Sequence, residues 1–176
     1  MKRLINRLQK QNKKIAVAES CTGGLISKKI TDTPGASAVF ECGVTAYSND
    51  IKIKLLGVKP ETLAEYGAVS EQTVIEMACG VLELSGADIA VSVSGIAGPG
   101  SDNTLKPVGT VCIGIATKEK SYATTFVFAG KRSEVRKMSC KMALDLAFDE
   151  LGIKKGKKGI VKTAKNAVKK LITKSK

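Results

Sequence analysis

The stretch IAVAESCTGGLISKKI, residues 15–30, decides the fold that we predict for this chain. It begins with an apolar run short enough for a buried strand, passes through ESCTGG, and continues as a helical pattern that Pro34 and Gly35 end. We therefore expect a strand over KIAVA (residues 14–18), a tight turn, and a helix from Thr22 to about Thr31. Strands that alternate with helices in this way are typical of α/β folds.

The rest of the chain continues this alternation. Further strands are predicted over residues 39–48, 88–95, 108–117 and 121–128, and the last two form an antiparallel hairpin around KEK. Helices are predicted near residues 4–8 and over residues 49–56, 70–86 and 133–151, and residues 56–70 are expected to be a loop-rich connection. The pattern predicts a layered α/β/α domain with a mixed β-sheet over residues 1–152.

A lysine-rich tail follows this domain. Residues 153–176 hold ten lysines and no acidic residue, and so account for ten of the thirteen net positive charges. Their apolar residues fall on one helical face: Ile160, Val161, Ala164, Val168, Leu171 and Ile172. A basic amphipathic helix of this kind can contact nucleic acid or an anionic membrane. A solvated or self-docked extension is the alternative.

The composition argues against a membrane span and a metal site. No apolar run approaches the roughly 20 residues that cross a bilayer, and the basic N-terminus lacks the apolar stretch of a secretory signal, so we expect a cytoplasmic protein. The chain has five cysteines without a C-x-x-C spacing and no histidine. We therefore predict reduced thiols and no zinc.

Two glycine-rich turns follow predicted strands, AESCTGG and SVSGIAGPG, and ligands of α/β sheets gather at such strand ends. Gly23 and Gly24 permit positive φ, and free N–H groups at the start of the next helix favour an anion. ESCTGG can therefore present Ser20 or Cys21 as a nucleophile, hold a phosphate, or form only a capped bend.

A nucleophilic serine or cysteine usually relies on a histidine, which this chain lacks. Tyr47 and Lys52, in AYSNDIKIKLLGV, are the remaining groups that could activate it. A lysine base must be neutral, and burial or a nearby cation such as Arg132 or Arg136 lowers its pKa. The alternative is a solvated surface lysine.

Six motifs occur in the order found in the C-terminal domain family of the competence-damage protein CinA, which this chain resembles: AESCTGG, AYSNDIKIKLLGV, GAVSEQTV, VSGIAGPG, KPVGTVCIGIA and GKRSEVR. The resemblance covers roughly residues 1–152 and implies a stand-alone form without the N-terminal domain of full-length CinA. It also implies hydrolysis of nicotinamide mononucleotide to nicotinate mononucleotide and ammonia, with no metal or other cofactor.

The resemblance also implies roles for individual residues. Ser20 matches the nucleophile, Lys52 the general base, and Tyr47 a residue that assists proton transfer. Ser94 stands where relatives often have threonine. Lys131 replaces the acidic residue of the usual GDR motif, a change that bears on how the neighbouring arginine is oriented.

The remaining site residues are assigned to the oxyanion and the phosphate. Main-chain N–H groups of Thr22, Gly23 and Gly24 are expected near the oxyanion. The phosphate is expected against GIAGPG and an arginine, with Gly95, Gly98 and either Arg132 or Arg136 as its contacts. A homo-oligomer, with a dimer favoured, is expected. The alternative function is an inactive module of the same family that binds a pyridine nucleotide.

Overall fold

The computed structural model describes residues 1–101 and 105–152. The strands in this part of the chain are β1 (Ile15–Glu19), β2 (Phe40–Thr45), β3 (Ile89–Gly95), β4 (Thr110–Thr117) and β5 (Ser121–Val127). The α-helices are α1 (Lys2–Lys10), α2 (Leu25–Thr31), α3 (Asn49–Leu56), α4 (Pro60–Tyr66), α5 (Glu71–Ser85) and α6 (Arg132–Glu150), and a short 3-10 helix covers Ala36–Ala38.

The strands form one mixed sheet in the order β2-β1-β3-β4-β5. β1 is parallel to β2 and β3, whereas β4 pairs antiparallel with β3 and β5. β1 is buried along its whole length, as expected of a parallel strand covered on both faces. Parallel strands end at one edge of the sheet, so Glu19 of β1 lies beside Thr45 of β2 and Val93 of β3.

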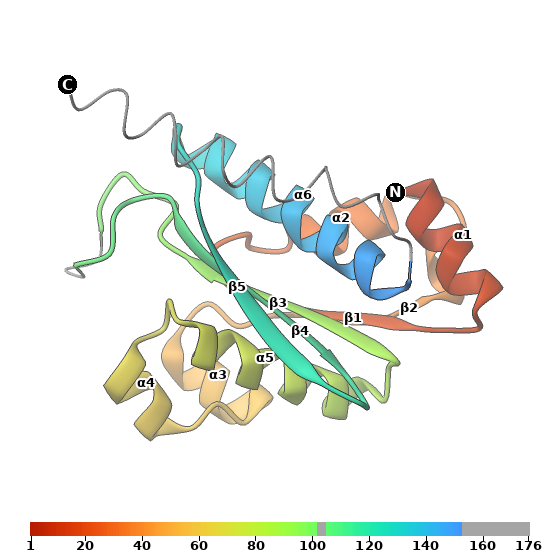
Figure 1. Cartoon of the computed structure of the whole chain (residues 1–176), viewed down its shortest axis with the longest axis horizontal. Coiled ribbons are helices and arrows are strands. Elements are labelled where there is room, and N and C mark those ends of the chain that lie inside the picture. Colours follow the sequence, from red (N-terminus) through yellow and green to blue (C-terminus); the bar gives the residue numbers. More distant parts are fainter. Residues whose placement is uncertain (102–104, 153–176) are drawn as a thin grey trace.

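Helices cover both faces of the sheet (Figure 1). α1, α2 and α6 lie on one face and enclose a core of large aliphatic side chains, among them Ile5 and Ile26. α3, α4 and α5 lie on the other face, where the core is rich in alanine. A Cβ at Gly80 of α5 would overlap the main-chain carbonyl of Leu56 in α3. Glycine at this position therefore lets α3, which carries Lys52, lie close against α5.

The layered α/β architecture and the mixed sheet predicted from the sequence are confirmed. Two local predictions were wrong. Helix α2 begins at Leu25 rather than Thr22, because residues 21–24 form a turn. The expected loop over residues 56–70 contains α4, which starts at Pro60, where the fixed φ of proline suits a first helical position. The predicted tail helix lies outside the described residues.

No helix in the described part of the chain is both long enough and apolar enough to cross a membrane.

Candidate active site

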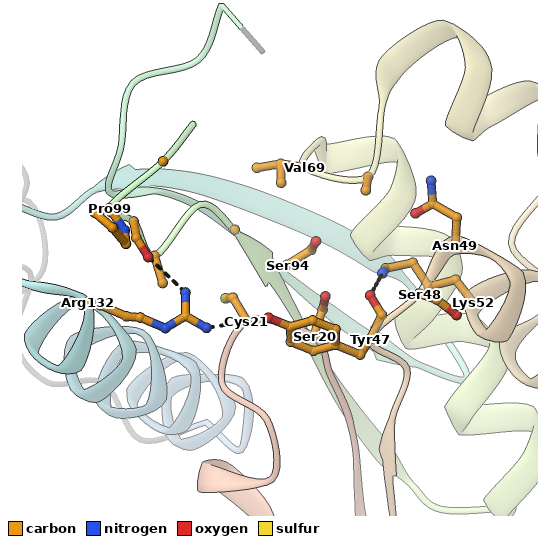
Figure 2. Close-up of a pocket in the computed structure, with 15 residues that line it drawn as sticks. Ser20, Cys21, Tyr47, Ser48, Asn49, Lys52, Val69, Ser94, Pro99 and Arg132 are labelled. Atoms are coloured by element: carbon orange, nitrogen blue, oxygen red, sulfur yellow. Dashed lines mark hydrogen bonds between the residues drawn. The ribbon is translucent and has the colours of Figure 1, made fainter. Parts of the chain in front are cut away.

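A cavity of about 490 Å³ opens at the C-terminal ends of the parallel strands. The residues that line it come from segments far apart in the sequence: Ser20, Cys21, Tyr47, Ser48, Asn49, Lys52, Ala68, Val69, Ser94, Gly95, Ala97, Gly98, Pro99, Gly100 and Arg132. Figure 2 shows Lys52 and Arg132 approaching from opposite sides, with Ser20, Tyr47 and Ser94 between them. The structure thus brings both turns singled out in the sequence, and the AYSNDIK segment, to one place.

Ser20 is the first residue after β1. Its N–H donates to the carbonyl of Val93 at 2.9 Å, which extends the β1–β3 pairing by one residue and fixes where Ser20 stands. The chain then turns sharply, with φ of 56° at Gly23 and 86° at Gly24, values that glycine adopts without strain. Ser20 is 8% exposed. The turn therefore holds the hydroxyl at the wall of the cavity on a rigid strand end.

Glu19 occupies the start of α2. Its fully buried carboxylate accepts hydrogen bonds from the N–H groups of Ile26 and Ser27, at 3.0 and 2.8 Å, and from Ser27 Oγ at 2.7 Å. The free N–H groups at the start of a helix attract an anion, and here the Glu19 carboxylate of the protein itself is that anion. This role was not predicted from the sequence, although a carboxylate that shortly precedes a glycine turn and a helix is a signal for it.

The main-chain donors expected near the oxyanion are only partly available. The Gly23 N–H donates to the Ser20 carbonyl at 3.0 Å. Thr22, Gly23 and Gly24 are not among the described residues that line the cavity. The N–H groups of Cys21 and Thr22 make no main-chain hydrogen bond within the described residues.

Arg136 lies behind this turn and outside the lining of the cavity. Its Nε donates to the Cys21 carbonyl at 3.1 Å, and its Nη2 donates to the Thr22 carbonyl at 2.6 Å. A Cβ at Gly23 would lie 3.3 Å from Nη2, so glycine leaves room for the guanidinium. Because a peptide C=O and the N–H of the next residue point in opposite directions, Arg136 directs the Thr22 N–H away from itself.

Lys52 is carried by α3, whose first turn is capped by Ser48 through a bond from the Ile51 N–H. The side chain of Lys52 is only 1% exposed. Its Nζ donates to the Tyr47 carbonyl at 3.1 Å, and none of the ion pairs between described residues includes it. Burial lowers the pKa of Lys52 below its ordinary value. The surface alternative for Lys52 was therefore wrong.

Arg132 and Tyr47 meet at the mouth of the cavity. Arg132 donates to the Gly98 carbonyl at 2.9 Å and to the Tyr47 hydroxyl at 3.4 Å (Figure 2). The Tyr47 side chain is 64% exposed. Lys131 precedes α6, and its N–H donates to Glu134 at 2.7 Å, so the helix start is capped although the usual acidic residue is absent. Arg132 therefore keeps a fixed direction into the cavity.

Ser94, Gly95 and Gly98 form the wall contributed by β3 and the loop after it. The hydroxyl-bearing side chain of Ser94 is nearly fully buried. A Cβ at Gly95 would lie 2.8 Å from the Thr110 carbonyl, so the pairing with β4 leaves no room for a side chain there. Ala68 and Val69 also line the cavity; they belong to the GAVSEQTV motif, but no role was predicted for either residue.

Cys21 also lines the cavity, as the rival nucleophile. Burial raises the pKa of its thiol to about 12, against a smaller opposing effect of its own N–H and of Arg136. The thiolate is the reactive form of cysteine, so Cys21 is a poor nucleophile at neutral pH.

Within the described residues, no three His, Cys, Asp or Glu side chains group as metal ligands.

The family model for the CinA C-terminal domain matches residues 1–151. A CinA-like protein of Endomicrobium trichonymphae is 55% identical over 141 residues, which cover 80% of this chain and 33% of that protein. A CinA-like protein of Chloroherpeton thalassium is 52% identical over 143 residues, covering 79% of this chain and 34% of that protein. The chain thus spans about a third of the length of these curated relatives.

Solved structures show the same fold. The competence/damage inducible protein CihA from Agrobacterium tumefaciens is 38% identical with a TM-score of 0.82, and the match covers 86% of this chain and 92% of that chain. A CinA superfamily protein from Klebsiella pneumoniae is 34% identical with a TM-score of 0.81, and covers 85% and 94% of the two chains.

Proposed function

The chain belongs to the CinA C-terminal domain family, and we propose that it hydrolyses the carboxamide of nicotinamide mononucleotide to give nicotinate mononucleotide and ammonia. One observation carries the proposal. Lys52 is a buried amine with no carboxylate partner among the described ion pairs, and it lines the same cavity as Ser20. Such an amine in one cavity with a hydroxyl can be the base that a chain without histidine needs.

In the first half of the reaction, Ser20 Oγ attacks the carboxamide carbon and its proton passes to neutral Lys52. The new bond makes a tetrahedral intermediate whose oxygen carries the negative charge. Lys52 then returns the proton to the carboxamide nitrogen, the C–N bond breaks, and ammonia leaves. The product of this half is an ester between Ser20 and the nicotinoyl group.

In the second half, water follows the same route. Lys52 takes a proton from the water as its oxygen attacks the ester carbon. The bond to Ser20 Oγ breaks, and the proton returns to that oxygen, which restores the enzyme and releases nicotinate mononucleotide. Lys52 thus serves as base and acid in each half, and the proton transfers require no second base.

The oxyanion is held, in this proposal, by the N–H groups of Cys21 and Thr22, which follow the nucleophile directly. Both lack a main-chain acceptor within the described residues. Arg136 supports the Thr22 N–H from behind, because it binds the Cys21 carbonyl of the same peptide unit. Donors fixed in advance around a developing charge are worth about 3–4 kcal/mol each to an acyl transfer.

The phosphate is assigned to Arg132, which stands on the side of the cavity opposite Lys52 (Figure 2). Among the described contacts, the guanidinium donates only to neutral oxygens, the Gly98 carbonyl and the Tyr47 hydroxyl. A phosphate is a stronger partner than either, because both groups of the new hydrogen bond are charged. The cavity of about 490 Å³ has the size of ordinary small-molecule sites.

The direct test is to incubate the protein with nicotinamide mononucleotide in water enriched in ¹⁸O. We expect ammonia and nicotinate mononucleotide in equal amounts, with one ¹⁸O atom in each product carboxylate. Nicotinate mononucleotide serves as the substrate control and should release nothing. Binding of nicotinamide mononucleotide without any release of ammonia would contradict the proposal and would leave a nucleotide-binding module.

A further inference from the structure

Strand β5 forms one edge of the sheet (teal in Figure 1). At one end of the β4–β5 pair the Phe128 N–H donates to the Gly109 carbonyl, and at the other the Thr117 N–H donates to the Lys120 carbonyl, both at 2.9 Å. In an antiparallel pair, the main-chain N–H and C=O groups of alternate residues face the partner strand. The even-numbered residues of β5 therefore face β4, and the odd-numbered ones turn their N–H and C=O groups away from the sheet.

We define the outer edge of β5 as the main-chain groups that face away from the sheet, those of Ser121, Ala123, Thr125 and Val127. No main-chain hydrogen bond between described residues uses these groups outside the strand pairing itself. The side chains of Ser121, Thr125 and Val127 are exposed and that of Ala123 is half-buried. Within the described residues, the outer edge is therefore open to another strand.

The composition of β5 does nothing to block such a strand. Its sequence, SYATTFV, has no charged residue and no proline, and it consists mostly of residues that favour strands. Natural proteins usually protect an open edge with a lysine, another charge or a proline. The opposite edge follows that rule, because β2 carries Glu41, which is paired with Lys14 at 2.6 Å.

We infer that the outer edge of β5 pairs with the same edge of a second copy of this chain, in antiparallel orientation. A two-fold axis makes this arrangement self-complementary, since each odd-numbered residue offers one donor and one acceptor to its counterpart. With the axis at Thr124, Ser121 of one copy lies opposite Val127 of the other. The absence of charge from β5 suits pairing with a second copy, because two identical charged edges would repel each other.

Cross-linking across the axis tests this inference without reference to any activity. Directly opposite residues of an antiparallel pair have Cα atoms about 4.5–5.5 Å apart, within reach of a disulfide. Mild oxidation of the full chain carrying Thr124→Cys should therefore give a disulfide-linked dimer. Lys118→Cys is the matched control: it lies in the adjoining turn, about 40 Å from its counterpart in this register, and should give no more dimer than wild type.

Disruption of the edge provides a second measurement. The Ala123 N–H faces outward, so Ala123→Pro removes a donor from the outer edge and none from the β4 pairing. Sedimentation equilibrium should show a dimer for wild type and at least a tenfold weaker association for Ala123→Pro. A monomeric wild type, an unchanged dimer in a folded Ala123→Pro protein, or no cross-link beyond the wild-type level in Thr124→Cys would each overturn the inference.

Discussion

The Nζ atom of Lys52 lies 3.1 Å from the main-chain carbonyl oxygen of Tyr47. A carbonyl only accepts hydrogen bonds, so it holds one N–H of Lys52 whether the amine is charged or neutral. In the neutral amine this bond leaves the lone pair in one of the two positions that point away from the carbonyl. We propose that the lone pair then accepts the proton of Ser20, which lines the same cavity.

Activity should rise with pH. Lys52 must lose its own proton before it can take the proton of Ser20 during the attack, and burial lowers the pKa of Lys52 from its ordinary 10.5. In the free enzyme kcat/KM should therefore increase tenfold per pH unit below that lowered pKa, and level off above it at a pH below 10.5. A Lys52→Arg variant should be inactive throughout, because a guanidinium keeps its proton. A wild-type profile that falls as pH rises, or that levels off only above pH 10.5, would contradict this role.

Removing the charge of Lys52 should stabilise the fold. Because its pKa is lower in the folded than in the unfolded chain, folding is less favourable wherever the unfolded lysine is charged, which includes neutral pH. That cost is relieved as pH rises from the folded pKa towards 10.5. Lys52→Met should therefore raise the free energy of unfolding at pH 7 by about 1–2 kcal/mol, and by less at pH 10.

Urea unfolding at the two pH values measures this difference. Lys54→Met, an exposed position on the same helix, is the matched control and should change stability little. Equal destabilisation by both substitutions would show that the charge of Lys52 costs nothing.

Loss of the Glu19 carboxylate should weaken the start of α2. Glu19→Gln replaces one of two acceptor oxygens by a donor, which then faces the N–H group of either Ile26 or Ser27. Leaving such a buried donor unsatisfied costs about 1–3 kcal/mol, which a shift of the urea midpoint measures. Glu41→Gln breaks only the exposed pair with Lys14 and should cost less than about 1 kcal/mol. Equal stability of the two variants would contradict this role of Glu19.

The two arginines should have separable effects. Arg132→Ala should raise KM for nicotinamide mononucleotide about tenfold to a hundredfold, the equivalent of a hydrogen bond to a charged group. It should change KM for nicotinamide riboside, which lacks the phosphate, much less. Arg136→Ala should instead lower kcat for both substrates to a similar degree, because Arg136 holds the turn after Ser20 and not the phosphate. If Arg136→Ala alone removed the preference for the phosphate, the assignments would be reversed.

Much of the fold follows from local sequence patterns. The apolar run before ESCTGG and the alternation around KEK reflect burial and strand pairing, which depend on residues close in the chain. The start of α2 was misplaced because Glu19 supplies the partner for its first N–H groups from the preceding strand. Pro60 was predicted to be a loop residue, although proline is also frequent in the first turn of a helix.

The site was predictable where topology alone decides position. Ser20, Tyr47 and Ser94 each stand at or just beyond the C-terminal end of a strand, and β1, β2 and β3 are parallel, so these residues meet. Arg132 and Arg136 are four residues apart on α6, yet only Arg132 lines the cavity. Which of the two faces it depends on how α6 packs against the turn after Ser20, and no local pattern contains that information.

The most direct test of the central claim compares Ser20→Ala with Cys21→Ala in an assay of ammonia release from nicotinamide mononucleotide. The two residues are neighbours in the same turn and both line the cavity, so each variant controls for disturbance of the turn by the other. We predict that Ser20→Ala lowers kcat by at least a thousandfold while Cys21→Ala keeps most of the wild-type rate. Full activity in a folded Ser20→Ala protein would contradict the account.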